Sequence, residues 1–405
     1  MTITLDISFP STTPWNPGHR KHGQLPIFES GRAVQGTVVV SPKNLRTPIS
    51  GIVRVTLEGT LSNHVDLAGE SSSMLYHTFV HQKIINLNVT YPEQQFISNV
   101  DQCYRFRFLV PNSITGPVSN KYGQDMPSSL NINFSPASHR AAILSSKGTC
   151  SIDYRIRAQF LAEGRCVVDT SRPFTLLASQ ARQPPVCIED FPGEYKLSAL
   201  KTLRNPLLRP TGRLHVYSHE PYPLEFSPEK EGAATSVRLR LRYESLKNGD
   251  AKRKHPPRLH GIFRSNLKAS TFISIEPQRR SPAMCDASAF PFTFETRKSY
   301  PSQLRRLCFP RWTPLEMGTE TIWETEAELI FKCHNTSYLT PSFSSMLVSR
   351  RYSLKLYMVI SGHGHAALKL ELPIQVGYTG RRFLPSEEII YTSGPAEDMP
   401  PAYSS

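Results

Sequence analysis

The sequence predicts an all-β protein built from two β-sandwiches. Apolar and polar residues alternate at period two along most of the chain, a pattern typical of strands with one buried side. The 405 residues include 34 Pro against 22 Gly, and each interior Pro removes a hydrogen-bond donor from a helix. No long segment shows the 3.6-residue period of an amphipathic helix.

Seven segments show the alternation clearly, and we expect each to form a half-buried antiparallel strand. They are centred on residues 53–57, 85–89, 104–108, 152–160, 237–243, 354–360 and 368–372. Between the last two lies Gly362-His363-Gly364-His365, which favours a tight hairpin turn. A short helix is predicted near residues 138–146.

The domain organisation follows from a break in this pattern. The strand-like run RPFTLLA is followed by Gln183-Pro184-Pro185, which predicts a boundary. The boundary leaves residues 1–182 and 183–378, each long enough for one immunoglobulin-type sandwich with its own core. Residues 379–405 hold Gly, Pro, Ser and acidic residues with little to bury, so we expect a disordered tail.

The predicted tail contains the PPxY sequence Pro400-Pro401-Ala402-Tyr403. Consecutive prolines favour the stiff, extended polyproline II helix, which loses little entropy when it docks into an aromatic-lined groove. WW domains recognise ligands in this way. Pro400, Pro401 and Tyr403 are therefore the predicted WW-binding residues, with Pro401 against the groove aromatics and Tyr403 in a neighbouring pocket.

Several strings taken together resemble the arrestin fold. In the first half they are GRAVQGTVVV, ISGIVRVTLEGTLSN, YRFRFLVP, CSIDYRIRAQF and RPFTLLA. In the second half they are PPRLHGIFRSNLKASTFISIEP and YSLKLYMVISGHGHAALKLELPIQV. With the PPxY sequence behind them, the chain resembles an α-arrestin, one of the arrestin-related trafficking adaptors. This chain has one PPxY, where relatives often carry two.

The resemblance implies two arrestin-like sandwiches in tandem, over residues 1–182 and 183–378. It implies an adaptor that binds membrane transporters or receptors and recruits a HECT-type ubiquitin ligase through its WW domains. Cargo ubiquitination and endocytosis would follow, at the cytoplasmic side of the plasma membrane or endosomes. The alternative is an arrestin-fold scaffold for signalling or endosomal sorting that works without a ligase, as in fungal ambient-pH sensing.

The charge of the chain is concentrated in its second half. The formal net charge is +14, and residues 201–320 hold 22 Lys and Arg against 11 Asp and Glu. A strand face and a loop provide the candidate surface for anionic lipids or an acidic cargo tail: Arg238, Arg240, Arg242, Lys252, Arg253 and Lys254. The alternative interpretation is that the strand arginines lie on an ordinary strand face exposed to solvent and bind no partner. Nucleic acid is not expected, because no recognition helix, zinc spacing or aromatic RNA-binding signature occurs.

The sequence predicts neither an enzyme nor a cofactor or metal site. It has no nucleophile elbow, glycine-rich phosphate loop or HExxH motif. His363 and His365 have no nearby Cys or carboxylate ligands, and Glu324, Glu326 and Glu328 recur as on one solvated strand face. The seven Cys are widely spaced, so we expect reduced, mostly buried thiols. No secretory leader or transmembrane segment is predicted.

Overall fold

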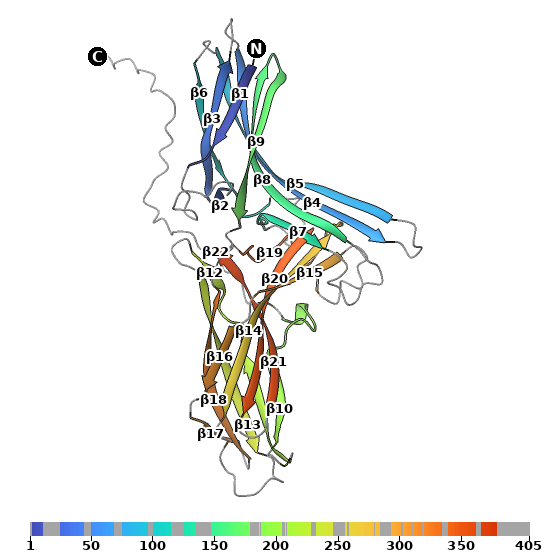
Figure 1. Ribbon diagram of the computed structural model, residues 1–405, viewed down its shortest axis with the longest axis vertical. Helices are drawn as coiled ribbons and strands as arrows, with labels where there is room; N and C mark the ends of the chain where they lie inside the picture. The colour runs from blue at the N-terminus through green and yellow to red at the C-terminus, as the bar shows by residue number, and fades with distance from the viewer. Residues whose placement is uncertain are drawn as a thin grey trace, which may run out of the picture.

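The computed structural model shows an all-β protein, as the sequence predicts (Figure 1). It describes residues 2–10, 25–43, 50–68, 75–95, 100–114, 125–134, 147–178, 186, 188–204, 207, 209–227, 232–245, 256, 259–278, 280–283, 293–300, 303–309, 311–317, 320–333, 339–361 and 366–378. These ranges contain 22 strands and one 3-10 turn, η2 (Ile188–Asp190). None of the helical structure within them is long and apolar enough to cross a membrane.

The first half holds nine strands in two sheets. The strands are β1 (Thr2–Ser8), β2 (Ile27–Glu29), β3 (Ala33–Lys43), β4 (Ser50–Ala68), β5 (Leu75–Gln95), β6 (Gln102–Leu109), β7 (Leu130–Phe134), β8 (Lys147–Ala162) and β9 (Arg165–Leu177). One sheet has the order β1-β3-β6. The other has the order β2-β9-β8-β4-β5, with β7 also paired to β8.

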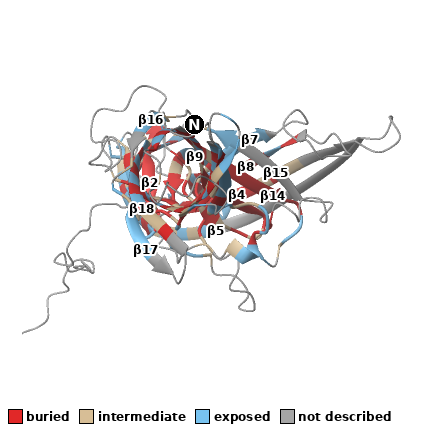
Figure 2. Cartoon of the chain, turned by 90° about the horizontal axis from the view of Figure 1, so that it is seen from below, coloured by how far each residue is buried: buried red, intermediate tan, exposed pale blue. Residues whose placement is uncertain are grey.

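The two sheets of the first half pack face to face around a shared core. Val55, Leu57 and Ile156 point inward from one sheet, and Val38 and Phe106 point inward from the other. All are buried, and each contributes about 1.5–3 kcal/mol through removal of apolar surface from water. The end-on view shows buried residues within the strand layers and exposed residues on their outer surface (Figure 2).

The second half holds thirteen strands. They are β10 (Ser198–Arg204), β11 (Pro210–Ser218), β12 (Leu224–Phe226), β13 (Ala233–Ser245), β14 (His260–Ser274), β15 (Thr293–Ser299), β16 (Gln303–Cys308), β17 (Thr313–Met317), β18 (Glu320–Cys333), β19 (Phe343–Ser344), β20 (Val348–Ser361), β21 (Ala366–Ile374) and β22 (Val376–Tyr378). One sheet has the order β10-β11-β13-β18-β17. The other has the order β15-β14-β20-β19, with β16 on β14 and β21 on β20, while β12 pairs with β22.

The second core lies between these two larger sheets. Leu239 and Leu329 face it from one sheet, and Phe263, Leu354 and Leu370 face it from the other. β20 and β21 pair antiparallel up to Ile360 opposite Ala366, as expected for a hairpin. The predicted turn at 362–365, the predicted helix at 138–146 and the predicted tail at 379–405 lie outside the described residues.

The strands divide into two groups, one in each half of the chain, but each hydrophobic core also contains side chains from the other half. The first core includes apolar side chains from the second half: Ile273, Ile275, Phe343, Leu347 and Val348. The second core includes Ile27 and Leu177 from the first half. Asn63, on β4, is fully buried, and its Nδ2 donates to the carbonyl oxygen of Ser274 at 2.8 Å. The two halves therefore share a packed interface where they meet (Figure 1).

Arg351, on β20, binds the segment around η2, which precedes the first strand of the second half. Its guanidinium carbon lies 4.2 Å from the centroids of both the Phe191 and the Phe272 rings. Its Nη2 donates to both carboxylate oxygens of Glu194 at 2.8 Å, and Nη1 donates to the carbonyl oxygen of Pro282 at 2.7 Å. The side chains of Arg351 and Glu194 are only 12% and 9% exposed. This contact joins the segment around η2 to both β14 and β20.

Candidate functional site

Three groups of side chains define the candidate sites: the predicted partner motifs, an ion-pair cluster on the first half, and a cavity between the halves. Pro400, Pro401 and Tyr403 lie outside the described residues, and so do Lys252, Arg253 and Lys254. Of the predicted site residues, the structure therefore places only the three arginines of β13.

Arg238, Arg240 and Arg242 lie on the outer face of the five-stranded sheet, as their alternation with Val237, Leu239 and Leu241 indicates. β13 pairs antiparallel with β18 along its length. The register places each arginine opposite a glutamate: Arg238 opposite Glu328, Arg240 opposite Glu326, and Arg242 opposite Glu324. The basic stripe and the acidic stripe of the sequence are therefore neighbours on one sheet face.

One contact within this face joins a register pair, Arg240 with Glu326, and the other contacts connect nearby residues of the same face. Arg240 Nε lies 2.5 Å from Glu326 Oε1, and hydrogen bonds with Tyr217 and then Glu326 raise the pKa of Arg240. Arg242 Nε lies 3.9 Å from Glu244 Oε1, and Ser236 is hydrogen-bonded to Glu328. The three arginines thus have carboxylate neighbours that offset their charge. Two stripes of equal spacing and opposite sign are the sequence signal for such a pairing.

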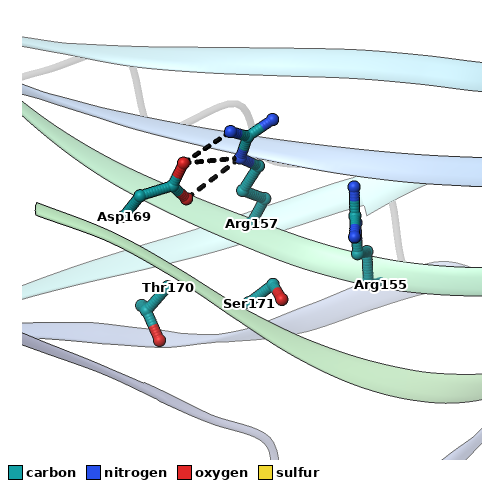
Figure 3. A pocket seen from close by; sticks show the side chains of 5 residues that line it. All are labelled: Arg155, Arg157, Asp169, Thr170 and Ser171. Carbon is teal, nitrogen blue, oxygen red and sulfur yellow. Dashed lines mark hydrogen bonds and ion pairs between the residues drawn. The ribbon is translucent and has the colours of Figure 1, made fainter. Parts of the chain in front are cut away.

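An ion-pair cluster on the first half lines a shallow pocket of about 260 Å³ (Figure 3). Arg157 Nη2 lies 2.5 Å from Asp169 Oδ2, and its Nε donates to Oδ1 at 2.9 Å. Arg155 Nε donates to the buried Glu58 at 2.8 Å, and Arg157 Nη1 lies 3.4 Å from the same carboxylate. The hydrogen bond from Arg157 is the main cause that lowers the pKa of Asp169.

This cluster is balanced, because its two arginines are paired with two carboxylates. Thr170 and Ser171 complete the pocket wall, and Figure 3 shows Arg155 standing apart from the Arg157–Asp169 pair. An incoming anion would have to compete with Asp169 and Glu58 for the guanidinium groups. The arrangement supports a structural link between β4, β8 and β9 rather than a ligand site.

A larger cavity of about 670 Å³ lies between the two halves. Its first-half wall comes from β7, β8 and β9, and its second-half wall comes from β14, β15, β20 and Thr340. Lys298 and Arg350 are the basic residues of the lining, and Asp153 is the acidic one. No pattern in the sequence indicates this cavity, because its two walls are formed by strands far apart in the chain.

The described side chains offer no metal site. No group of three or more His, Cys, Asp or Glu side chains in the described ranges could hold a metal ion. Glu324, Glu326 and Glu328 lie opposite arginines in the register, while His363 and His365 fall outside those ranges.

Cys103, Cys150, Cys166 and Cys333 are free thiols, as expected, but only one of these four side chains is buried. Cys103 and Cys166 are exposed, Cys333 is intermediate and Cys150 is buried. Cys103 is exposed because it precedes Tyr104 on β6 and therefore points to the opposite, outer side of the strand. Burial, and then the charge of Asp153, raises the pKa of the Cys150 thiol to about 12, so it stays protonated at neutral pH.

Comparison with known proteins adds no relative from which a role could be transferred. No family model matches the sequence, and no curated protein matches it either. The functional assignment therefore rests on the PPxY sequence, the all-β architecture and the side-chain geometry described above.

Proposed function

We propose that this protein is an adaptor that binds membrane transporters or receptors and recruits a HECT-type ubiquitin ligase, promoting cargo ubiquitination and endocytosis. The observation that carries the proposal is Pro400-Pro401-Ala402-Tyr403, which follows the last described strand, β22. The prolines favour the polyproline II conformation that WW domains bind, and Tyr403 supplies the selective side chain.

The fold supports the other part of this proposal. Two cores built from stacked sheets, with an interface that both share, provide a stiff body for holding cargo near a ligase. We propose that these cores correspond to the tandem sandwiches of an α-arrestin. On this view the protein acts peripherally at the plasma membrane or endosomes and contacts the cytoplasmic tails of its cargo.

Tyr403→Ala is expected to weaken binding of the full chain to WW domains of HECT ligases by a factor of about 30. This factor corresponds to roughly 2 kcal/mol, the typical effect of a hot-spot residue. A single WW contact is typically micromolar, a range that calorimetry measures directly. Tyr391→Ala is the matched control, because Tyr391 follows β22 as Tyr403 does but lies outside the motif.

A tail peptide phosphorylated on Tyr403 should also lose binding, because a phosphate brings charge into an apolar pocket. Undiminished affinity of that peptide would contradict the proposed role of Tyr403. Absence of binding by the wild-type chain to a panel of such WW domains would instead favour the arrestin-fold scaffold that acts without a ligase.

Removing the charges of Lys252, Arg253 and Lys254 is expected to weaken binding to anionic liposomes. Removing the charges of Arg238, Arg240 and Arg242 should weaken this binding less. Changing each set to Gln lowers the net charge by the same amount, but the β13 arginines already have glutamate neighbours. At about 1 kcal/mol per residue near an anionic surface, the first change should weaken binding by a factor of about 150. Liposome sedimentation measures both variants, and equal losses would contradict a specific role for residues 252–254.

A further inference from the structure

Arg350 is a buried cation at the wall of the cavity between the halves. The residue is 6% exposed, and it lies on β20 directly beside the stacked Arg351. Neighbouring residues of a strand point to opposite faces, so the side chains of the two arginines lie in different environments. Figure 1 shows β20 and β15 close to β7, where the second half meets the first.

The hydrogen bonds of Arg350 all go to neutral hydroxyl groups. Its Nε donates to Tyr352 Oη at 2.9 Å, Nη1 donates to Thr271 Oγ1 at 2.8 Å, and Nη2 donates to Tyr300 Oη at 3.2 Å. Nη1 and Nη2 each carry a second N–H group, and a guanidinium remains charged at any pH a protein meets. Within the described part of the chain, no carboxylate forms an ion pair with Arg350.

Tyr352 does not supply the missing negative charge. Tyr352 Oη donates its proton to the carbonyl oxygen of Thr340 at 2.5 Å while it accepts from Arg350. Burial raises the pKa of Tyr352 above its usual range, so its phenol stays neutral. Burial of an arginine without an anionic partner is unfavourable, which favours binding of an anion beside it.

The rest of the cavity suits an oxyanion with an organic group attached. Lys298, exposed on β15, adds a second cation, and its Nζ lies 5.5 Å from the centroid of the Tyr300 ring. Asn131 on β7 lines the opposite wall and brings amide donors from the first half. Asp153 opposes an anion, but it is exposed and solvated, and the two cations outnumber it. The volume of about 670 Å³ falls within the range of small-molecule sites.

We propose that this cavity binds the oxyanion group of a small molecule, a phosphate monoester or a carboxylate, with Arg350 as its main ligand and Lys298 as its second. The guanidinium presents a planar set of donors that matches either anion. Since the lining comes from both halves, the bound molecule ties them together. This binding role is additional to the proposed adaptor function and does not depend on it.

The test uses the full-length chain and two probes, inorganic phosphate and citrate, at constant ionic strength with chloride as the balancing anion. At least one probe is expected to raise the melting temperature saturably in the millimolar range, because a ligand that binds only the folded state stabilises it. Phosphate and citrate separate the two classes of ligand. No saturable shift with either probe overturns the proposal.

Variants show whether the binding is at this cavity. Lys298→Gln is expected to raise the Kd about tenfold, and Arg350→Gln is expected to remove saturable binding while the far-UV circular dichroism spectrum is unchanged. Lys201→Gln, an exposed lysine on β10 that does not line the cavity, should leave the Kd unchanged. If Arg350→Gln fails to fold, the Kd of Lys298→Gln tests the assignment by itself. A Kd equal to that of the wild type then overturns the assignment of binding to this cavity.

Discussion

Arg351→Ala is expected to lower the free energy of unfolding by about 3–5 kcal/mol, the range for breaking a buried ion pair. The change removes a cation held between the rings of Phe191 and Phe272. It also leaves the carboxylate of Glu194, whose side chain is 9% exposed, without its bidentate partner. Urea denaturation followed by tryptophan fluorescence measures the loss.

Two further variants separate geometry from charge. Arg351→Lys keeps the charge but loses the planar stack and the two-pronged contact with Glu194, so we expect a loss of about 2 kcal/mol. Arg213→Ala, at an exposed position on β11, should stay within about 0.5 kcal/mol of the wild type. An Arg351→Ala variant as stable as Arg213→Ala would show that the stacked contact contributes nothing to stability.

The alternation of the sequence was sufficient to predict the strands, because a strand with one buried side carries its own signal. Val55 and Leu57 are buried on β4, and Leu354 and Leu356 are buried on β20, as period two requires. The same reasoning predicted the hairpin between β20 and β21, since only a short turn separates the two runs. These are local features, and local sequence determines them.

The pairing of strands distant in sequence was not predictable in this way. Arg240 and Glu326 are adjacent in space although 86 residues separate them, so the basic stripe was interpreted without its acidic neighbour. Arg350 and Arg351 are adjacent in the sequence, yet one lines a cavity between the halves and the other stacks between two phenylalanine rings. Their surroundings depend on the register of β14 against β20 and on how the halves meet.

Glu371→Gln is expected to lower the free energy of unfolding by about 3–5 kcal/mol at pH 7. Glu371 Oε1 lies 2.7 Å from Lys268 Nζ, Oε2 lies 4.0 Å from Lys355 Nζ, and Ser353 Oγ donates to Oε1 at 2.9 Å. The side chains of Glu371 and Lys268 are 13% and 11% exposed. Neutralising the carboxylate leaves the largely buried ammonium of Lys268 without this ion-pair partner.

The pH dependence of this effect follows from the pKa of Glu371. Burial acts to raise that pKa, but the hydrogen bond and charge of Lys268, followed by the charge of Lys355, lower it more, so the folded-state pKa lies below the usual value. The unfolded chain therefore binds the proton more readily. The stabilisation is complete well above about pH 4.3, the ordinary pKa of Glu in the unfolded chain, and is lost as the pH falls past that value and through the folded-state pKa.

The difference in unfolding free energy between the wild type and Glu371→Gln should thus be constant near neutrality and shrink as the pH falls from about 5 to 3. Urea denaturation at a series of pH values measures it. Glu189→Gln, at an exposed position in η2, provides the control, and at pH 7 it should stay within about 0.5 kcal/mol of the wild type. A Glu371→Gln difference that stayed constant down to pH 3 would mean that the carboxylate stabilises the fold by packing rather than by its charge.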